Sequence, residues 1–483
     1  MFRWDGRRFT MTRTVRDMLI YTVSLIGTRA IGFALLPINT HFLRSADYGR
    51  LEVLLAFADI GGLLFSLGLP STLNRFVGKL EGWDERRRVC GEILFISIVS
   101  AAGFGSLCQA LASPLTSLLP GNLQLTEVRL LLVSLSFEAV IGVGLGWLRI
   151  RDRAEYYLVL TLARGLLQAV ISTTLLAFGA GVVGIIAGGA IATLIEVVAI
   201  LGLVLPDTGL RLGRIHLRPL MIYCLPILFA GCAAFTLGSL DRWMLVGAVS
   251  ASDLARYGVA VKISAVAATL VQPFNMWWTS KRFIVLNGPN GKQATAANAT
   301  VGVVAAMLAA VVTALGGPLL IQLLTPVEYH SAAAYVPWLA LAFAVQEVGT
   351  FLNTGCYDRA DGFASLGVNL AAAGLIVVLY LLLIPPFGVA GAIAATIGAQ
   401  GARSLFYHVV SQRRVRLEYP GQRLTLLCIG CCAGVFGAYT GLQPFGAAVA
   451  AVPLAAALGL VALQLKLLPL PAGGFRIGRR SGL

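Results

Sequence analysis

The sequence predicts an all-α integral membrane protein with about fourteen transmembrane helices, and three observations support this prediction. Hydrophobic residues make up 58% of the 483-residue chain and charged residues only 12%, whereas soluble domains are about 25% charged. The mean hydropathy is +0.83. Long apolar runs recur along the whole chain, and a bilayer needs roughly 20 helical residues per crossing. Lipid is therefore the expected solvent for most of this chain.

Polar breaks separate the apolar runs into fourteen candidate spans. The spans cover residues 18–43, 51–77, 91–113, 128–148, 156–178, 183–205, 219–240, 254–279, 296–324, 332–355, 363–384, 389–410, 424–441 and 446–467. The loops between them on the predicted outer side are short. They leave no domain outside the membrane that could hold an active site, so the sequence does not predict an enzyme.

The distribution of basic residues orients these spans. With the N-terminus placed inside, 27 of the 37 Lys and Arg residues fall in inside segments and five in outside segments. Cytoplasmic loops carry such an excess of Lys and Arg. Both termini are therefore expected in the cytoplasm, with the chain in the cell inner membrane. The net charge of +15 is then explained by topology and by attraction to anionic lipids, rather than by nucleic acid binding.

Two sequence echoes indicate a duplicated six-helix unit. Tyr48-Gly49 recurs as Tyr257-Gly258, an offset of 209, and the Gly-Val-x-Gly motif at 181–184 recurs at 388–391, an offset of 207. Both copies start from the same side, so the two lobes are parallel repeats. The expected organisation is an interfacial N-terminus at 1–17, an N-lobe at 18–205, a linker at 206–218, a C-lobe at 219–410, two further helices at 411–467, and a cytoplasmic tail at 468–483.

Ionisable residues inside the predicted spans are the candidate functional residues. Each costs at least ~2.5 kcal/mol at mid-bilayer, so such groups tend to face a cavity or one another. Basic side chains would bind phosphate oxygens, and the candidates for substrate binding are Arg29, Arg75, Arg164, Lys262 and Arg403. The candidates for ion coupling or charge pairing are Glu52, Asp59, Glu138 and Glu347. Purely structural pairing of these charges is the alternative.

Several other kinds of site are not expected. The eight cysteines mostly lie in apolar runs, where cysteine behaves as a small hydrophobic residue. Cys428 and Cys431 have a CxxC spacing but no neighbouring His or carboxylate to complete a metal site. The sequence has no Walker A motif, no GxSxG and no HExxH. No metal, no cofactor and no catalytic residue is therefore predicted.

Short motifs spread over most of the chain carry a family resemblance. They are RAIGF at 29–33, PINTHFL at 37–43, DYG at 47–49, SLGL at 66–69, NRF at 74–76, DR at 241–242, YG at 257–258 with Lys262, and IPPFGVAGA at 384–392. In this order the chain resembles the Wzx-type O-antigen and exopolysaccharide flippases of the MATE-like (MOP) exporter superfamily.

The resemblance implies two six-helix lobes in a V shape, around a cavity that opens alternately to each side. It implies a polyprenyl-pyrophosphate-linked oligosaccharide as cargo for lipopolysaccharide or exopolysaccharide synthesis, with a polymerase and chain-length proteins as partners. Basic residues of the inner helices matter in the family, and Arg29, Arg75 and Lys262 correspond in kind, as do Arg164 and Arg403. The alternatives are an ion-coupled MATE-like exporter of small molecules and, less favoured, a membrane glycosyltransferase.

Overall fold

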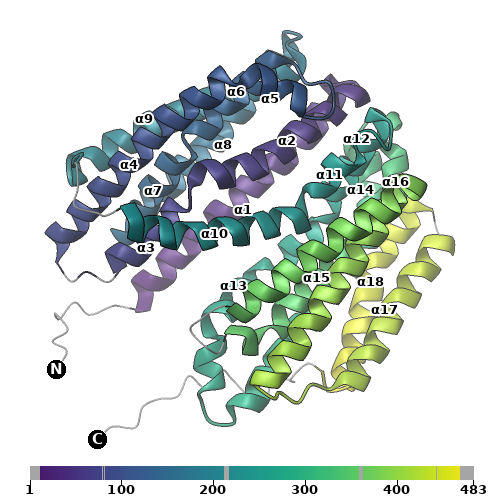
Figure 1. Ribbon diagram of the computed structural model, residues 1–483. Coiled ribbons are helices and arrows are strands. Elements are labelled where there is room, and N and C mark those ends of the chain that lie inside the picture. The colour runs from purple at the N-terminus through teal and green to yellow at the C-terminus, as the bar shows by residue number, and fades with distance from the viewer. Residues whose placement is uncertain are drawn as a thin grey trace, which may run out of the picture. The chain divides into compact units, whose positions relative to one another are not determined.

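The computed structural model is helical throughout the part of the chain that it describes. The described residues are 11–78, 80, 82–211, 217–357, 363–441 and 443–467. Their only β feature is an isolated bridge between Val246 and Val249. Most of the expected interfacial N-terminus, the middle of the 206–218 linker and the expected tail at 468–483 lie outside these residues. The predicted all-α fold class is confirmed (Figure 1).

The helices form two compact units. Unit 1 comprises Met1–Gly258, Leu324–Glu328 and Ile384–Val389. Its helices are α1 (Met11–Phe42), α2 (Ser45–Ser66), α3 (Leu69–Gly78), α4 (Trp83–Ala110), α5 (Ala112–Leu118), α6 (Leu125–Ser136), α7 (Glu138–Ile150), α8 (Ala154–Ala177), α9 (Gly181–Thr208), α10 (Leu217–Gly238), α11 (Leu240–Leu245) and the start of α12 (Ala251–Ser264). Its apolar core lies where α3, α4, α7 and α9 meet around the buried ring of Trp147.

Unit 2 comprises Val259–Leu323, Tyr329–Leu383 and Ala390–Leu483. Apart from the two short segments Leu324–Glu328 and Ile384–Val389 of unit 1, it contains the rest of α12, then α13 (Val266–Leu286), α14 (Gly291–Leu324), η1 (Val327–Tyr335), α15 (Val336–Leu352), η2 (Thr354–Tyr357), α16 (Phe363–Arg414), α17 (Gly421–Gly441) and α18 (Pro444–Gln464). The last two helices pack against α14 through small and aliphatic side chains such as Ala447, Ala451 and Leu458.

The number of membrane spans agrees with the predicted number of about fourteen. Twelve helical segments in the described residues are long and apolar enough to cross a bilayer. One of them, Phe363–Arg414, is 52 residues long and contains the non-helical Gly388, with φ 54° and ψ −127°. It therefore joins two predicted spans across a sharp kink. The remaining predicted span corresponds to α10, of which Leu228–Gly238 forms a shorter apolar helix.

Several spans that read as continuous in the sequence are two helices in the structure. The second span breaks at Leu67 and Gly68, both with positive φ, and Leu67 ends α2 in a left-handed conformation. The fourth breaks at Phe137 and the eighth at Ala265. Hydropathy stays high across each of these breaks. The apolar pattern therefore located the spans but not their internal breaks.

The two Tyr-Gly motifs of the sequence repeat lie against each other within unit 1. A Cβ at Gly49 on α2 would overlap the carbonyl oxygen of Ala251 on α12, and a Cβ at Gly258 would overlap the side chain of Glu52 on α2. The hydroxyls of Ser45 and Ser252 are 3.1 Å apart at the same place. Each motif therefore supplies the small residue that lets the other helix approach closely.

Candidate functional site

The predicted site residues are distributed over both units. Unit 1 holds Arg29, Glu52, Asp59, Arg75, Glu138 and Arg164. Unit 2 holds Lys262, Glu347 and Arg403. Within each unit, some of these side chains are brought together with charged or polar partners that the sequence did not identify.

Arg164 lies between two carboxylates in unit 1. It projects from α8, with Nε 3.3 Å from Oε2 of Glu196 on α9 and Nη2 3.7 Å from Oε1 of Glu138 on α7. The same Nη2 donates to the hydroxyl of Thr193 at 3.4 Å. The side chains of Arg164 and Glu138 are about a third exposed, at 31% and 30%, whereas Glu196 is buried. The cluster is therefore partly exposed at Arg164 and Glu138 and buried at Glu196.

Arg29 lies at a depth similar to that of Arg164. Helices α1 and α8 run in parallel, because Tyr21 packs edge-on against Tyr157 and the hydroxyls of Ser24 and Thr161 are 2.6 Å apart. Arg29 follows these contacts on α1 as Arg164 does on α8, and it is exposed. Arg75, near the end of α3, is exposed as well.

A second charged cluster joins α2 to α11 and α12 within unit 1. Arg242 reaches Oε2 of Glu52 from Nε at 3.4 Å and Oδ1 of Asp241 from Nη1 at 3.2 Å. The hydroxyl of Tyr257 donates to Oδ2 of Asp241. Glu52 is 1% exposed, and the Arg242 side chain is 12% exposed. Arg242 is therefore buried between two carboxylates.

Asp59 extends this contact along α2. Its Oδ2 accepts a hydrogen bond from the Ser239 hydroxyl at 2.7 Å, and the indole of Trp243 donates to the carbonyl of Val53 at 3.4 Å. Further along, Leu63 packs at Gly231. Helices α10 and α11 therefore run antiparallel to α2. Both Glu52 and Asp59 of α2 contact this segment.

Arg403 belongs to a polar chain inside unit 2. Its Nε donates to Oδ1 of Asn369 at 2.9 Å, and the same oxygen accepts from the Tyr407 hydroxyl at 3.1 Å. The Tyr407 hydroxyl is 3.1 Å from the Ser365 hydroxyl, which donates to the Tyr357 hydroxyl at 2.6 Å. All these residues lie on α16 or η2. The chain of contacts runs towards the end of unit 2 where α16 begins and ends.

A buried arginine completes this chain at the end of unit 2. Arg282 donates from Nη1 to Oδ1 of Asn353 at 2.9 Å, and its guanidinium lies 4.5 Å from the ring centre of Tyr357. Burial lowers the pKa of Arg282, although the nearby phenol and thiol groups partly oppose the shift. Burial also raises the pKa of the Cys356 thiol to about 11, against the effect of Arg414 and Arg282. Both are consequences of burial.

The other predicted residues of unit 2 lie on α12 and α15. Lys262 is half-buried on α12. Glu347 is buried on α15, and its Oε2 accepts from the amide of Asn275 on α13 at 3.1 Å. This amide donor partly satisfies a buried carboxylate that lies in a membrane-spanning helix.

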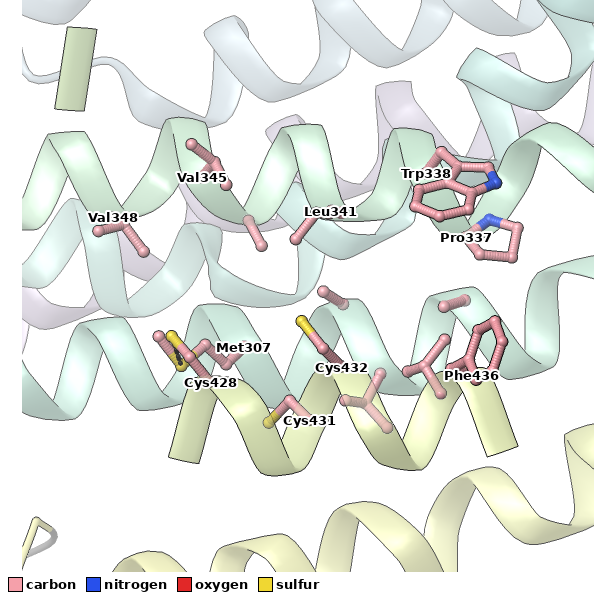
Figure 2. A pocket seen from close by; sticks show the side chains of 15 residues that line it. Met307, Pro337, Trp338, Leu341, Val345, Val348, Cys428, Cys431, Cys432 and Phe436 are labelled. Carbon is pink, nitrogen blue, oxygen red and sulfur yellow. Dashed lines mark hydrogen bonds between the residues drawn. The ribbon is translucent and has the colours of Figure 1, made fainter. Parts of the chain in front are cut away.

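Unit 2 also contains an apolar pocket of about 550 Å³. Figure 2 shows Trp338 and Leu341 of α15 on one side and Cys432 and Phe436 of α17 on the other. Met307 of α14 and two more cysteines, Cys428 and Cys431, complete the wall. Among the described residues, no group of three or more His, Cys, Asp or Glu side chains could hold a metal ion. These cysteines therefore contribute apolar surface to the pocket.

Sequence reasoning missed several members of these clusters. Glu196 is a further ionisable residue inside a predicted span, and nothing in its spacing linked it to Arg164. Tyr257 was noticed as part of the repeat but not as a hydrogen-bond donor to Asp241. Arg282 falls in a segment that reads as a basic loop. Burial and packing between helices, which single-helix patterns do not report, give these residues their partners.

Comparisons with known proteins agree with the resemblance seen in the sequence. Residues 40–276 match the family model described as "Polysaccharide biosynthesis protein". No curated protein matches the chain. The fold is similar to that of the lipid II flippase MurJ in an inward closed conformation, with a TM-score of 0.70 and 11% identity over 93% of this chain and 98% of that one.

MATE transporters share the fold at lower TM-scores. A multidrug resistance MATE family transporter of the MOP superfamily, in an inward-facing conformation, matches with a TM-score of 0.59 and 15% identity, covering 82% of this chain and 98% of that chain. A mutant of the Vibrio cholerae MATE transporter VcmN matches with a TM-score of 0.56 and 13% identity, covering 84% and 98%. Residues 40–276 thus match a polysaccharide biosynthesis family model, and the chain as a whole has the multi-pass membrane fold that the lipid II flippase MurJ and the MATE transporters share.

Proposed function

We propose that the protein is a flippase that moves a polyprenyl-pyrophosphate-linked oligosaccharide across the cell inner membrane for surface polysaccharide synthesis. One observation carries the proposal: a polysaccharide biosynthesis family match lies within a chain that shares the fold of a lipid II flippase over nearly its full length. In this proposal the protein is a transporter and not an enzyme. It uses no cofactor, metal or nucleic acid.

The charges in the membrane helices suit such a cargo. A pyrophosphate-linked lipid carries negative charge, and guanidinium groups bind phosphate oxygens in pairs. The proposed substrate-binding residues are Arg29, Arg75, Arg164, Lys262 and Arg403. Arg29 and Arg75 are exposed in unit 1, so both lie at the surface of that unit.

The apolar pocket of unit 2 suits the hydrocarbon part of the cargo. It lies between α14, α15 and α17, and its wall includes Trp338, Leu341 and Phe436 (Figure 2). Burial of hydrocarbon is favourable in proportion to the apolar area covered where the alternative is water. A hydrocarbon tail that enters this pocket comes from lipid and not from water, so the pocket would select the tail by its shape.

Alternating access of an N-lobe at 18–205 and a C-lobe at 219–410 is the proposed mechanism, with both termini in the cytoplasm. Ion coupling or charge pairing is assigned to Glu52, Asp59, Glu138 and Glu347. Membrane lipids surround the protein, and a polysaccharide polymerase and chain-length proteins are its proposed partners.

The proposal is tested by removing single cations. Replacing Arg29 or Lys262 by Ala is expected to stop surface polysaccharide assembly at unchanged protein levels, because the anionic cargo loses a binding group. Arg44, an exposed arginine just before α2, provides the matched control, and Arg44→Ala should assemble normal polysaccharide. Normal polysaccharide in both the Arg29→Ala and the Lys262→Ala strains would contradict the assignment of these residues.

The second candidate function is ion-coupled export of small cationic molecules, favoured by the fold shared with MATE transporters. Carboxylates would then dominate the binding site. A drug-efflux assay separates the two functions: raised resistance in cells expressing the protein would support export, and unchanged resistance would support the flippase. A membrane glycosyltransferase is the least favoured function, because the predicted loops are too short for a catalytic domain.

A further inference from the structure

The cluster of Glu138, Arg164 and Glu196 in unit 1 carries an excess negative charge. One guanidinium serves two carboxylates, at 3.3 Å from Glu196 and 3.7 Å from Glu138. With all three groups ionised the cluster has a formal charge of −1. All three residues lie inside membrane-spanning helices, where uncompensated charge is unfavourable. One additional positive charge would make the cluster neutral.

The carboxylate of Glu196 is the group that lacks donors. The residue is 4% exposed, and neither of its side-chain oxygens has a hydrogen-bond partner in the described part of the chain. The contact with Arg164 is an ion pair without hydrogen-bond geometry. The nearby Thr193 hydroxyl accepts from Arg164. Buried carboxylate oxygens normally have hydrogen-bond partners. The oxygens of Glu196 therefore have the capacity to bind a further group.

The second charged cluster of unit 1 differs in this respect. Glu52 and Asp241 also share one guanidinium, that of Arg242. There, Asp241 accepts from the backbone and side chain of Arg242 and from the Tyr257 hydroxyl, and Glu52 has no buried oxygen without a partner. The same formal charge is therefore compensated by hydrogen bonds in that cluster and not at Glu196.

The other helices packed against α9 bring no further positive charge to Glu196. Helix α8 contributes Arg164 and α7 contributes Glu138. On α2, Glu52 is paired with Arg242 and Asp59 accepts from Ser239. On α4, Glu92 is paired with Arg88, and on α6, Glu127 is paired with Arg50 while Arg129 is exposed. Arg164 is the only basic group of the described residues within ion-pair distance of Glu196.

These observations decide which cation fits. A sodium ion on the same oxygens would lie beside the Arg164 guanidinium, and like charges at such distances repel strongly where the dielectric constant is low. A proton needs no coordination shell and binds directly to a carboxylate oxygen. We propose that Glu196 is the proton-binding residue of this transporter and that protons reach it through the partly exposed Glu138.

The inference rests on the proposed function for its role in transport. A proton from water on one side forms an O–H bond with a Glu196 oxygen, and the same bond breaks to release the proton to the other side. Cargo and proton would thereby be exchanged. Arg164 would hold the two carboxylates close to each other while the proton moves between Glu138 and Glu196. The cluster therefore couples transport to the proton gradient, and Arg164, a proposed cargo-binding residue, links the proton site to the cargo.

The transport test uses the full-length protein in liposomes with a lipid-linked oligosaccharide, at a clamped membrane potential. One-for-one exchange predicts that the cargo ratio between the leaflets at steady state changes about tenfold per pH unit of gradient. Glu196→Gln should abolish this response, leaving a ratio near one, while cargo still equilibrates. Glu92→Gln, which removes a buried carboxylate paired one-to-one with the exposed Arg88, is the control and should respond like the wild type. A wild-type ratio that ignores the gradient, or a Glu196→Gln ratio that still follows it, overturns the proposal.

A second readout does not depend on cargo. Infrared difference spectra of the purified protein between low and high pH should show a carboxylic acid carbonyl band that disappears in Glu196→Gln and persists in Glu92→Gln. A spectrum unchanged by Glu196→Gln overturns the proposal even if transport is observed. If the band behaves as expected but no lipid-linked cargo moves in the wild type, the proton site stands and the proposed flippase function fails.

Discussion

At the residue scale, unit 1 depends on arginines that each serve more than one carboxylate. Arg242 is the most buried example, held between Glu52 and Asp241 with Tyr257 adding a hydrogen bond. Removing one partner of a buried ion pair leaves a charge that neither water nor protein compensates. The stability of this part of the fold therefore rests on the pairing as a whole.

Arg242→Met is expected to destabilise the protein by about 3–5 kcal/mol, because Glu52 and Asp241 would remain buried without a cation. Adding Glu52→Gln to that variant should recover part of the loss, because one unpaired carboxylate is then neutral. Thermal unfolding in detergent measures both. Equal melting temperatures for the wild type and Arg242→Met would show that the ion pair contributes nothing.

The sequence predicted the candidate site only in part. It identified Arg164 and Glu138 because ionisable residues stand out within apolar runs. It did not pair them, since α7 and α8 have separate periodicities and their relative rotation comes from packing. Glu196 and Arg282 were recognised only in the structure. Glu196 is buried without a hydrogen-bond partner in the described part of the chain, and Arg282 is buried with Asn353 as its partner. A single sequence reports which charges lie in the membrane but not which ones meet.

At the scale of elements, the sequence repeat corresponds to a physical contact. Gly49 of α2 and Gly258 of α12 each allow the opposing helix to approach closely. A one-methyl addition at Gly49 would meet backbone rather than a flexible side chain, because the nearest atom is the Ala251 carbonyl oxygen. The contact can therefore yield only by movement of a helix.

Gly49→Ala is expected to lower the stability of the protein by about 1–3 kcal/mol, the usual cost of overpacking. The matched control is Gly32→Ala on α1, where an added Cβ has nothing within 4 Å. Alanine favours a helix over glycine by up to about 1 kcal/mol, so the control should be neutral or stabilising. Melting temperatures measured by intrinsic fluorescence would separate the two, and equal effects at both positions would argue against the close contact.

Hydropathy alone predicted the positions of the spans, yet several internal breaks were not foreseen. The breaks at Leu67 and Ala265 fall inside apolar runs, where hydropathy does not mark them, although a positive-φ glycine, Gly68, stands beside the first. The kink at Gly388 was foreseen as a polar break between two spans. There, two prolines and a positive-φ glycine do signal a break in helix geometry.

At the scale of the whole molecule, the account predicts a defined topology. The excess of Lys and Arg on one set of predicted loops predicts that both termini lie in the cytoplasm. A tag inserted at Asn122, in the loop between α5 and α6, should react with a membrane-impermeant reagent in intact cells. A tag at Gly288, between α13 and α14, should react only after permeabilisation. The opposite labelling pattern would reverse the orientation of the chain and the assignment of its inner side.

A reconstituted flipping assay measures whether this protein moves a lipid-linked saccharide between leaflets. Liposomes containing the purified protein and a fluorescent polyprenyl-pyrophosphate oligosaccharide would be treated with an impermeant quencher. The account predicts that fluorescence from the inner leaflet is lost far faster than in protein-free liposomes, and that a double variant with Arg29→Ala and Lys262→Ala behaves like protein-free liposomes. Equal loss with and without the wild-type protein would contradict the proposed flippase function.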